Sequence, residues 1–166
     1  MKPISLAFGA ALMTFTAAQA MAEMSPADRT FATNAAAGGL AEVSLGQLAT
    51  QNAGSPVVRQ FGQQMVTDHT QANNELMQIG KQANLTLPTK PAAADHATEE
   101  RLRASKGAAF DTAYITDMIQ DHQKDVADFR QEADSGMDPA LKAFAKKYLP
   151  VLQHHLQMAQ AAKTGS

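Results

Sequence analysis

The sequence predicts an all-α protein, folded as an up-down-up-down bundle of four long helices. Its 166 residues are rich in alanine, glutamine and methionine, which lose little side-chain freedom in a helix, and they include no tryptophan. No stretch shows the alternation of polar and β-branched residues that is typical of a strand. Long segments with apolar residues at helical spacing are instead separated by turns that contain proline or glycine.

The first 22 residues have the composition of a secretory signal peptide. Lys2 supplies a positive charge, Ile4–Ala18 form an apolar run, and small residues follow at the spacing of a cleavage site. We expect cleavage after Ala20 or Ala22 and export to the periplasm or another part of the cell envelope. The run is too short to span a bilayer comfortably, so we expect no membrane span after cleavage. A retained membrane anchor is the alternative interpretation.

Two helices are expected to begin at Ser-Pro pairs. Ser25 is a good N-cap for a helix over Pro26–Asn52, and Asp28 completes a capping-box-like pattern. The turn sequence NAGSP ends this helix, and its own Ser-Pro pair begins a second helix over residues 56–83.

One long connection, over residues 84–107, joins the second and third long helices. The sequence NLTLPTKP ends the helical pattern, and a short helix is expected over residues 95–104, before Ser-Lys-Gly. A connection of this length is long enough to carry its helix across one end of the bundle.

The last two long helices are expected over residues 108–134 and 139–162, with the turn SGMDP between them. Pro150 falls inside the last helix, where proline removes a backbone donor, so we expect a kink or a break there. The bundle domain therefore covers residues 26–162.

Composition excludes several classes of function. The chain has no cysteine, and therefore no disulfide, thiolate nucleophile or cysteine-bound metal. Removal of residues 1–22 takes away one lysine and no acid, which changes the net charge from −2 to −3. A weakly acidic chain without a basic stripe is a poor candidate for nucleic-acid binding.

No Walker, Gly-x-Ser-x-Gly or His-Glu-x-x-His motif is present, so no catalytic residue is assigned. Protein partners are not identified by the sequence.

Two similar segments, MVTDH at 65–69 and MIQDH at 118–122, each place a histidine on an apolar helix face. The apolar face of every long helix is interrupted by one ionisable residue of this kind: Glu42, His69, His122 and His155. At 1.5 Å per residue they lie roughly 15, 20, 18 and 24 Å from the end where the first helix stops. We therefore expect the four side chains in one layer near the middle of the bundle.

Three imidazoles and a carboxylate suit a transition-metal ion such as Zn²⁺, Fe, Mn or Cu(II). Asp68 and Asp121 each precede a core histidine and are turned about 100° round the helix. There they could accept the second ring N–H of a ligating histidine, or bind a second metal. We predict a metal centre formed by Glu42, His69, His122 and His155, supported by these two aspartates. The alternative is a metal-free buried polar network in a structural or stress-related envelope protein.

Four segments of the chain carry a family resemblance: AAAGGLAEVSLGQLA (35–49), VRQFGQQMVTDHTQAN (58–73), FDTAYITDMIQDHQKDV (110–126) and LPVLQHHLQMA (149–159). They resemble exported bacterial proteins catalogued as domain of unknown function (DUF) 4142 and assigned to the ferritin-like superfamily. The resemblance covers about residues 27–162 and implies a ferritin-like four-helix bundle, sometimes labelled an outer-membrane protein. It implies no activity.

The sequence departs from the di-iron pattern of that superfamily. Such proteins carry Glu-x-x-His on two helices and a further glutamate on each of the others. The positions three residues before the core histidines hold Val66, Ile119 and Leu152, and only Glu42 has the expected carboxylate. Oxygen activation and iron storage are therefore not inferred, and the chain is not assigned as an enzyme.

Overall fold

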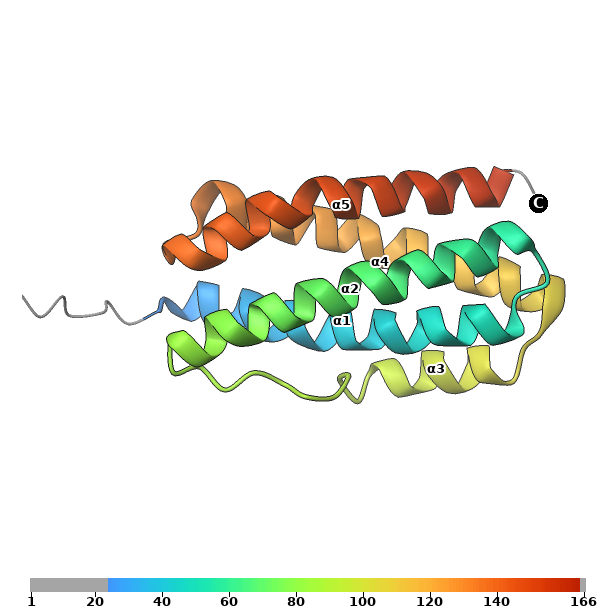
Figure 1. Ribbon diagram of the computed structural model, residues 1–166, viewed down its shortest axis with the longest axis horizontal. Helices are drawn as coiled ribbons and strands as arrows, with labels where there is room; N and C mark the ends of the chain where they lie inside the picture. Colours follow the sequence, from blue (N-terminus) through green and yellow to red (C-terminus); the bar gives the residue numbers. More distant parts are fainter. Residues whose placement is uncertain (1–23, 165–166) are drawn as a thin grey trace, which may run out of the picture.

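The structure is a computed structural model that describes residues 24–164, and it is all-α over that range, as predicted. Its helices are α1 (Pro26–Asn52), α2 (Pro56–Gln82), α3 (Asp95–Arg103), α4 (Gly107–Ser135) and α5 (Pro139–Thr164). The four long helices lie side by side, and α3 lies along their outside (Figure 1). The predicted signal peptide over residues 1–22 lies outside the described residues. None of the described helices has the length and apolarity needed to cross a membrane.

Polar caps explain where α1, α2 and α5 begin. Ser25 Oγ accepts a hydrogen bond from Asp28 N at 3.1 Å, and Ser55 Oγ accepts one from Val57 N at 3.2 Å. Asp138 caps α5 in the same way, with two bonds of 2.9 Å from backbone amides. Proline follows each cap, at a position whose N–H would have no partner inside the helix.

Helix α5 is not broken at Pro150. It continues as one helix of 26 residues through the exposed proline. Tyr148 and Leu152, on either side of it, are buried in the core. Their packing keeps the segment helical, although the proline removes one backbone hydrogen bond.

The predicted up-down-up-down order of the helices is wrong. The amides of Gly54 and Ser55, in the α1–α2 turn, donate to Asp111 near the start of α4, at 3.1 and 2.7 Å. The amides of residues 137–138, in the α4–α5 turn, donate to Asp28 near the start of α1, at 3.2 and 3.0 Å. Helix α4 therefore runs antiparallel to α1 and parallel to α2, and the order is up-down-down-up (Figure 1).

The long connection explains this difference. Residues 83–106 do not cross one end of the molecule. They run back along its side, with α3 next to α1 and α4 (Figure 1). A helix of 27 residues such as α2 is about 40 Å long, and a short turn cannot return the chain over that distance. The connection is long enough to do so, and α4 consequently begins where α1 ends.

Two apolar clusters fill the interior, one on each side of a polar layer. The cluster nearer the α1–α2 turn includes Phe61, Met65, Phe110, Tyr114 and Met118. The cluster nearer the α4–α5 turn includes Phe129, Leu141, Phe144, Tyr148 and Leu152. The buried polar residues between them are Glu42, His69, His122 and His155. Each lies close to the middle of its helix, so they share one layer although the directions of α4 and α5 were predicted wrongly.

Candidate metal centre

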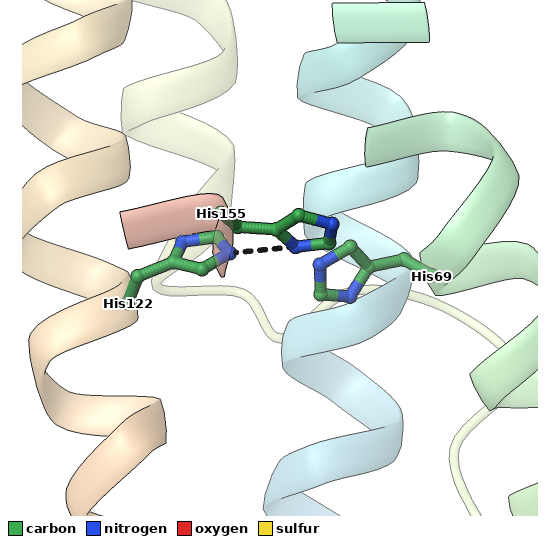
Figure 2. A group of neighbouring side chains, drawn as sticks. All are labelled: His69, His122 and His155. Atoms are coloured by element: carbon green, nitrogen blue, oxygen red, sulfur yellow. Dashed lines mark hydrogen bonds between the residues drawn. The ribbon is translucent and has the colours of Figure 1, made fainter. Parts of the chain in front are cut away.

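Three histidine side chains from three helices meet in the polar layer. His69 of α2, His122 of α4 and His155 of α5 have exposed fractions of 5%, 0% and 0%. Their ring centroids are 5.7 Å apart for His69 and His122, 5.3 Å for His69 and His155, and 5.4 Å for His122 and His155. Figure 2 shows the three rings turned toward one another.

The repeated Met-x-x-Asp-His segments account for two of these positions. Met65 and Met118 lie one helical turn before His69 and His122, and both methionines are fully buried in the neighbouring apolar cluster. The apolar face thus draws each histidine into the interior. His154 precedes His155 by one residue and is exposed, so it is not part of the cluster.

A hydrogen-bond acceptor holds the outer nitrogen of each ring. His69 Nδ1 lies 2.8 Å from Glu42 Oε2, and His155 Nε2 lies 2.7 Å from Asp68 Oδ2. His122 Nδ1 lies 3.0 Å from the backbone oxygen of Met118. We assign the proton of each neutral ring to this nitrogen, because the carbonyl, the carboxylate and the carboxyl group each offer it an acceptor oxygen.

The inner nitrogens of the three rings converge. His122 Nε2 and His155 Nδ1 are 3.3 Å apart (Figure 2). His69 Nε2 is buried and has no hydrogen-bond partner among the described residues. One nitrogen from each ring lies within 4.8 Å of the other two. In neutral rings whose outer nitrogens are protonated, all three inner nitrogens present lone pairs.

Burial keeps the rings neutral. It lowers the pKa of His69 to about 4. Burial, with repulsion from the other two histidines, lowers the pKa of His122 to about 3. Burial and His69 lower the pKa of His155 to about 4. A charged imidazolium is disfavoured because the dry interior does not solvate it.

Glu42 lies behind His69, on the side away from the convergence point. Its Oε2 bonds the outer nitrogen of His69, and its buried Oε1 lies 3.5 Å from the outer nitrogen of His122, without a hydrogen-bond partner among the described residues. Burial, and to a lesser extent Asp121, raises the pKa of Glu42 to about 8. In the structure this carboxyl group therefore lies beside the outer ring nitrogens of His69 and His122, whereas the sequence predicts it as a metal ligand.

The two predicted aspartates occupy different environments. Asp68 accepts a hydrogen bond from His155, on the neighbouring helix. Asp121 is exposed, and no hydrogen bond links it to a histidine of the cluster. Both residues are rotated by the same angle from the adjacent histidine, but the rotation turns Asp68 toward α5 and Asp121 toward the solvent side of α4.

Sequence reasoning missed Asp125, which lies one turn after His122 on α4. It interacts with Glu42 and His69, and burial followed by repulsion from Glu42 raises its pKa to about 8. Its spacing of three residues from His122 was the available signal, because side chains at that spacing share a helix face.

Two cavities border the cluster. A small one of about 30 Å³ touches His69 and His155. A larger cleft of about 360 Å³ lies between α1, α3 and α4, and its walls include Asp95, Asp121 and Asp125 beside Glu42. The first reaches the histidines themselves, and the second reaches the carboxyl groups behind them.

Comparisons with known proteins concern the family and the fold. A family model described as "Domain of unknown function (DUF4142)" matches residues 13–162. No curated protein matches the chain. A solved structure titled "Crystal structure of DUF305 fragment from Deinococcus radiodurans" is similar, with a TM-score of 0.75 and 12% sequence identity. The match covers 86% of this chain and 99% of that chain. At this identity the likeness shows a shared helical fold.

Proposed function

The chain belongs to the family described as "Domain of unknown function (DUF4142)", and on that premise we propose that it binds one transition-metal ion through His69 Nε2, His122 Nε2 and His155 Nδ1. Glu42, Asp68 and the carbonyl of Met118 would hold the outer ring nitrogens and so orient the three imidazoles. Such support by a carboxylate or a carbonyl is usual for metal-binding histidines.

The contact between His122 Nε2 and His155 Nδ1, at 3.3 Å, carries the proposal. Both rings already donate from their other nitrogen, to Met118 O and to Asp68. If both rings are neutral, two lone pairs therefore face each other in a buried site. A cation between them removes this conflict and gives each lone pair a partner.

The distances suit a metal ion. With bonds of about 2.0–2.1 Å, two nitrogens of a tetrahedral zinc site lie about 3.3 Å apart. His122 and His155 have that separation, and all three nitrogens lie within 4.8 Å of one another. A small movement of the His69 ring would complete the site. Neutral imidazoles favour Zn²⁺, Cu(II) or Fe over Mg²⁺ or Ca²⁺, which prefer oxygen ligands.

We also propose that residues 26–162 form a ferritin-like four-helix bundle. Helices α1 and α2 form one antiparallel pair and α4 and α5 another, and one long connection joins the pairs. A single long connection is typical of ferritin-like bundles.

Export to the cell envelope belongs to the same proposal. Its support is the sequence of residues 1–22, with Lys2 before the apolar run Ile4–Ala18. A site made of histidines suits an exported protein, because imidazole, unlike a thiolate, is not lost to oxidation in an oxidising compartment.

Elemental analysis of protein purified without a histidine tag tests metal binding. We expect about one transition-metal ion per chain, and an increase in the melting temperature when Zn²⁺ or Cu²⁺ is added to the metal-free protein. Binding at 100 times the Kd would stabilise the fold by about 2.7 kcal/mol. If the protein contains no bound metal and its melting temperature does not change with Zn, Cu, Mn or Fe, the proposal fails. These side chains would then form a metal-free polar network.

A further inference from the structure

The small cavity beside the histidines has room for a ligand of very few atoms. Its volume is about 30 Å³, and His69 and His155 form part of its wall. This volume is enough for about one water molecule. Phe129, Phe144 and Leu152 form apolar parts of the wall.

Asn73 supplies an unused hydrogen-bond donor to this cavity. It lies one turn after His69 on α2 and lines the same cavity. Its Nδ2 atom is buried and has no hydrogen-bond partner among the described residues. A buried amide without a partner destabilises a protein unless a bound molecule accepts its hydrogen bond.

Gly39 of α1 allows the amide to occupy this position. A Cβ atom at residue 39 would lie 2.3 Å from Asn73 Oδ1, far inside van der Waals contact. Any side chain at residue 39 would therefore displace Asn73. Because Gly39 has no side chain, the amide of Asn73 can lie beside the cavity.

Two carboxyl groups that line the cavity hold the outer nitrogens of its two histidines. Glu42 bonds the outer nitrogen of His69, and Asp68 bonds the outer nitrogen of His155. A tetrahedral ion held by three imidazoles has a fourth position, which protein atoms fill in structural sites and a solvent molecule fills in open ones. The small cavity borders two of the three rings, those of His69 and His155, and has room for such a solvent molecule.

We infer that the three-histidine centre keeps an open coordination position in this cavity, where a water molecule or a small anion binds the metal and accepts a hydrogen bond from Asn73. This inference rests on the proposed metal binding. A metal ion with an open position can exchange ligands, whereas a fully enclosed ion serves only to stabilise the fold.

Azide binding to the cobalt-loaded protein tests the inference. Untagged protein is stripped of metal and loaded with Co²⁺, the cobalt content is measured, and azide is then titrated while the visible absorption of Co²⁺ is recorded. The variants are Asn73→Ala and, as a matched control, Asn74→Ala, because Asn74 is an exposed neighbour of the same type. Alanine is favourable in a helix, so both variants are expected to fold.

We expect azide to change the spectrum of the wild type and of Asn74→Ala with the same Kd. Asn73→Ala should bind the same amount of cobalt but bind azide about tenfold or more weakly, the usual effect of losing a hydrogen bond to a charged group. A spectrum that azide leaves unchanged, or equal azide affinity in Asn73→Ala, would overturn the open position. Failure of the wild type to bind cobalt would instead overturn the metal centre itself.

Discussion

Each buried histidine has two ring nitrogens, and an acceptor from the protein holds one of them. Glu42, Asp68 and Met118 O are those acceptors, for His69, His155 and His122 respectively. The acceptor selects the tautomer of each ring and thus the nitrogen whose lone pair faces the centre. At the scale of residues, this choice of tautomers turns the lone pairs of the three rings toward one another, as the proposed metal ion requires.

Replacement of His122 by glutamine should abolish metal binding. His122→Gln removes one of three nitrogen ligands but keeps a polar side chain of similar size in the core. We expect the bound metal to fall well below one equivalent and the thermal shift with Zn²⁺ to disappear, because two imidazoles bind a divalent ion much more weakly than three. Elemental analysis and melting curves measure both effects.

His154→Gln is the control for this substitution. His154 is exposed and lies next to His155, so its replacement should leave both the metal content and the thermal shift as in the wild type. If His122→Gln keeps its metal, the ion is bound elsewhere.

The buried acids and histidines give the metal-free protein opposite responses to pH. Burial raises the pKa of Glu42 from 4.5 and that of Asp125 from 3.8, both to about 8. The folded state therefore holds protons that the unfolded chain has released, and stability is lost as the pH rises toward 8. The histidines have a lowered pKa, so their contribution is lost as the pH falls from 6.5 toward 4. Between about pH 4.5 and 6.5 the two contributions oppose each other, and above pH 6.5 only the loss from the acids remains, so stability should fall between pH 6.5 and 8.

Glu42→Gln tests the alkaline side of this profile. Glutamine keeps an oxygen that accepts from His69 but cannot ionise. Between pH 6.5 and 8.5 the metal-free wild type should lose up to about 2 kcal/mol through Glu42 alone, and the variant should not lose this part. Denaturant unfolding at the two pH values, with a chelator present, measures the difference. The exposed Glu100 provides the control, because Glu100→Gln should follow the wild-type profile.

At the scale of helices, glycines decide how closely α1 and α2 approach. A Cβ at Gly46 would lie 2.8 Å from the backbone oxygen of Gly62, and a Cβ at Gly62 would lie 2.5 Å from the Cβ of Ala49. Backbone atoms cannot yield as a flexible side chain does, so any larger residue must separate the helices. In contrast, a Cβ at Gly38 would have nothing within 4 Å.

Alanine substitutions at Gly46 and Gly38 should therefore change stability in opposite directions. Gly46→Ala forces the two helices apart and should cost about 1–3 kcal/mol. Gly38→Ala gains helix propensity without a clash and should stabilise the protein by about 0.5–1 kcal/mol. Chemical denaturation of the two variants measures both values. Equal effects at the two positions would show that close packing at Gly46 does not control this interface.

At the scale of the whole molecule, two helical hairpins correspond at a constant offset of 83 residues (Asp28 to Asp111, Pro56 to Pro139). Asp28 binds the turn of the α4–α5 hairpin, and Asp111 binds the turn of the α1–α2 hairpin. The same offset relates Glu42 to Asp125. The three histidines do not follow it, so the repeated Met-x-x-Asp-His segments are unrelated to this correspondence between the hairpins.

Asp111 should stabilise the association of the two hairpins. Its carboxylate accepts from Gly54 N and Ser55 N, and its exposed fraction is 8%. Asp111→Ala leaves both amides without this acceptor and should cost about 1–3 kcal/mol. The same substitution at the exposed Asp134 should change stability by less than about 0.5 kcal/mol. The free energy of unfolding of both variants, from urea titrations, checks the comparison; a similar small effect at both positions would contradict a linking role for Asp111.

The sequence by itself predicted what a single helix determines. The Ser-Pro and Asp-Pro starts located α1, α2 and α5, because a cap acts within one turn. The apolar spacing turned His69, His122 and His155 inward, because side chains three or four residues apart share a face. Their place near the middle of each helix put them in one layer whichever way the chain runs.

Tertiary structure decided everything that depends on two helices at once. The return path of residues 83–106 made the order up-down-down-up. Packing turned Asp68 toward His155 but left Asp121 exposed, and it paired Asp125 with Glu42. The physical reason is that helical periodicity is a local property of the chain. The rotation of each helix about its own axis, and the neighbour that it faces, follow from the packing of the whole core.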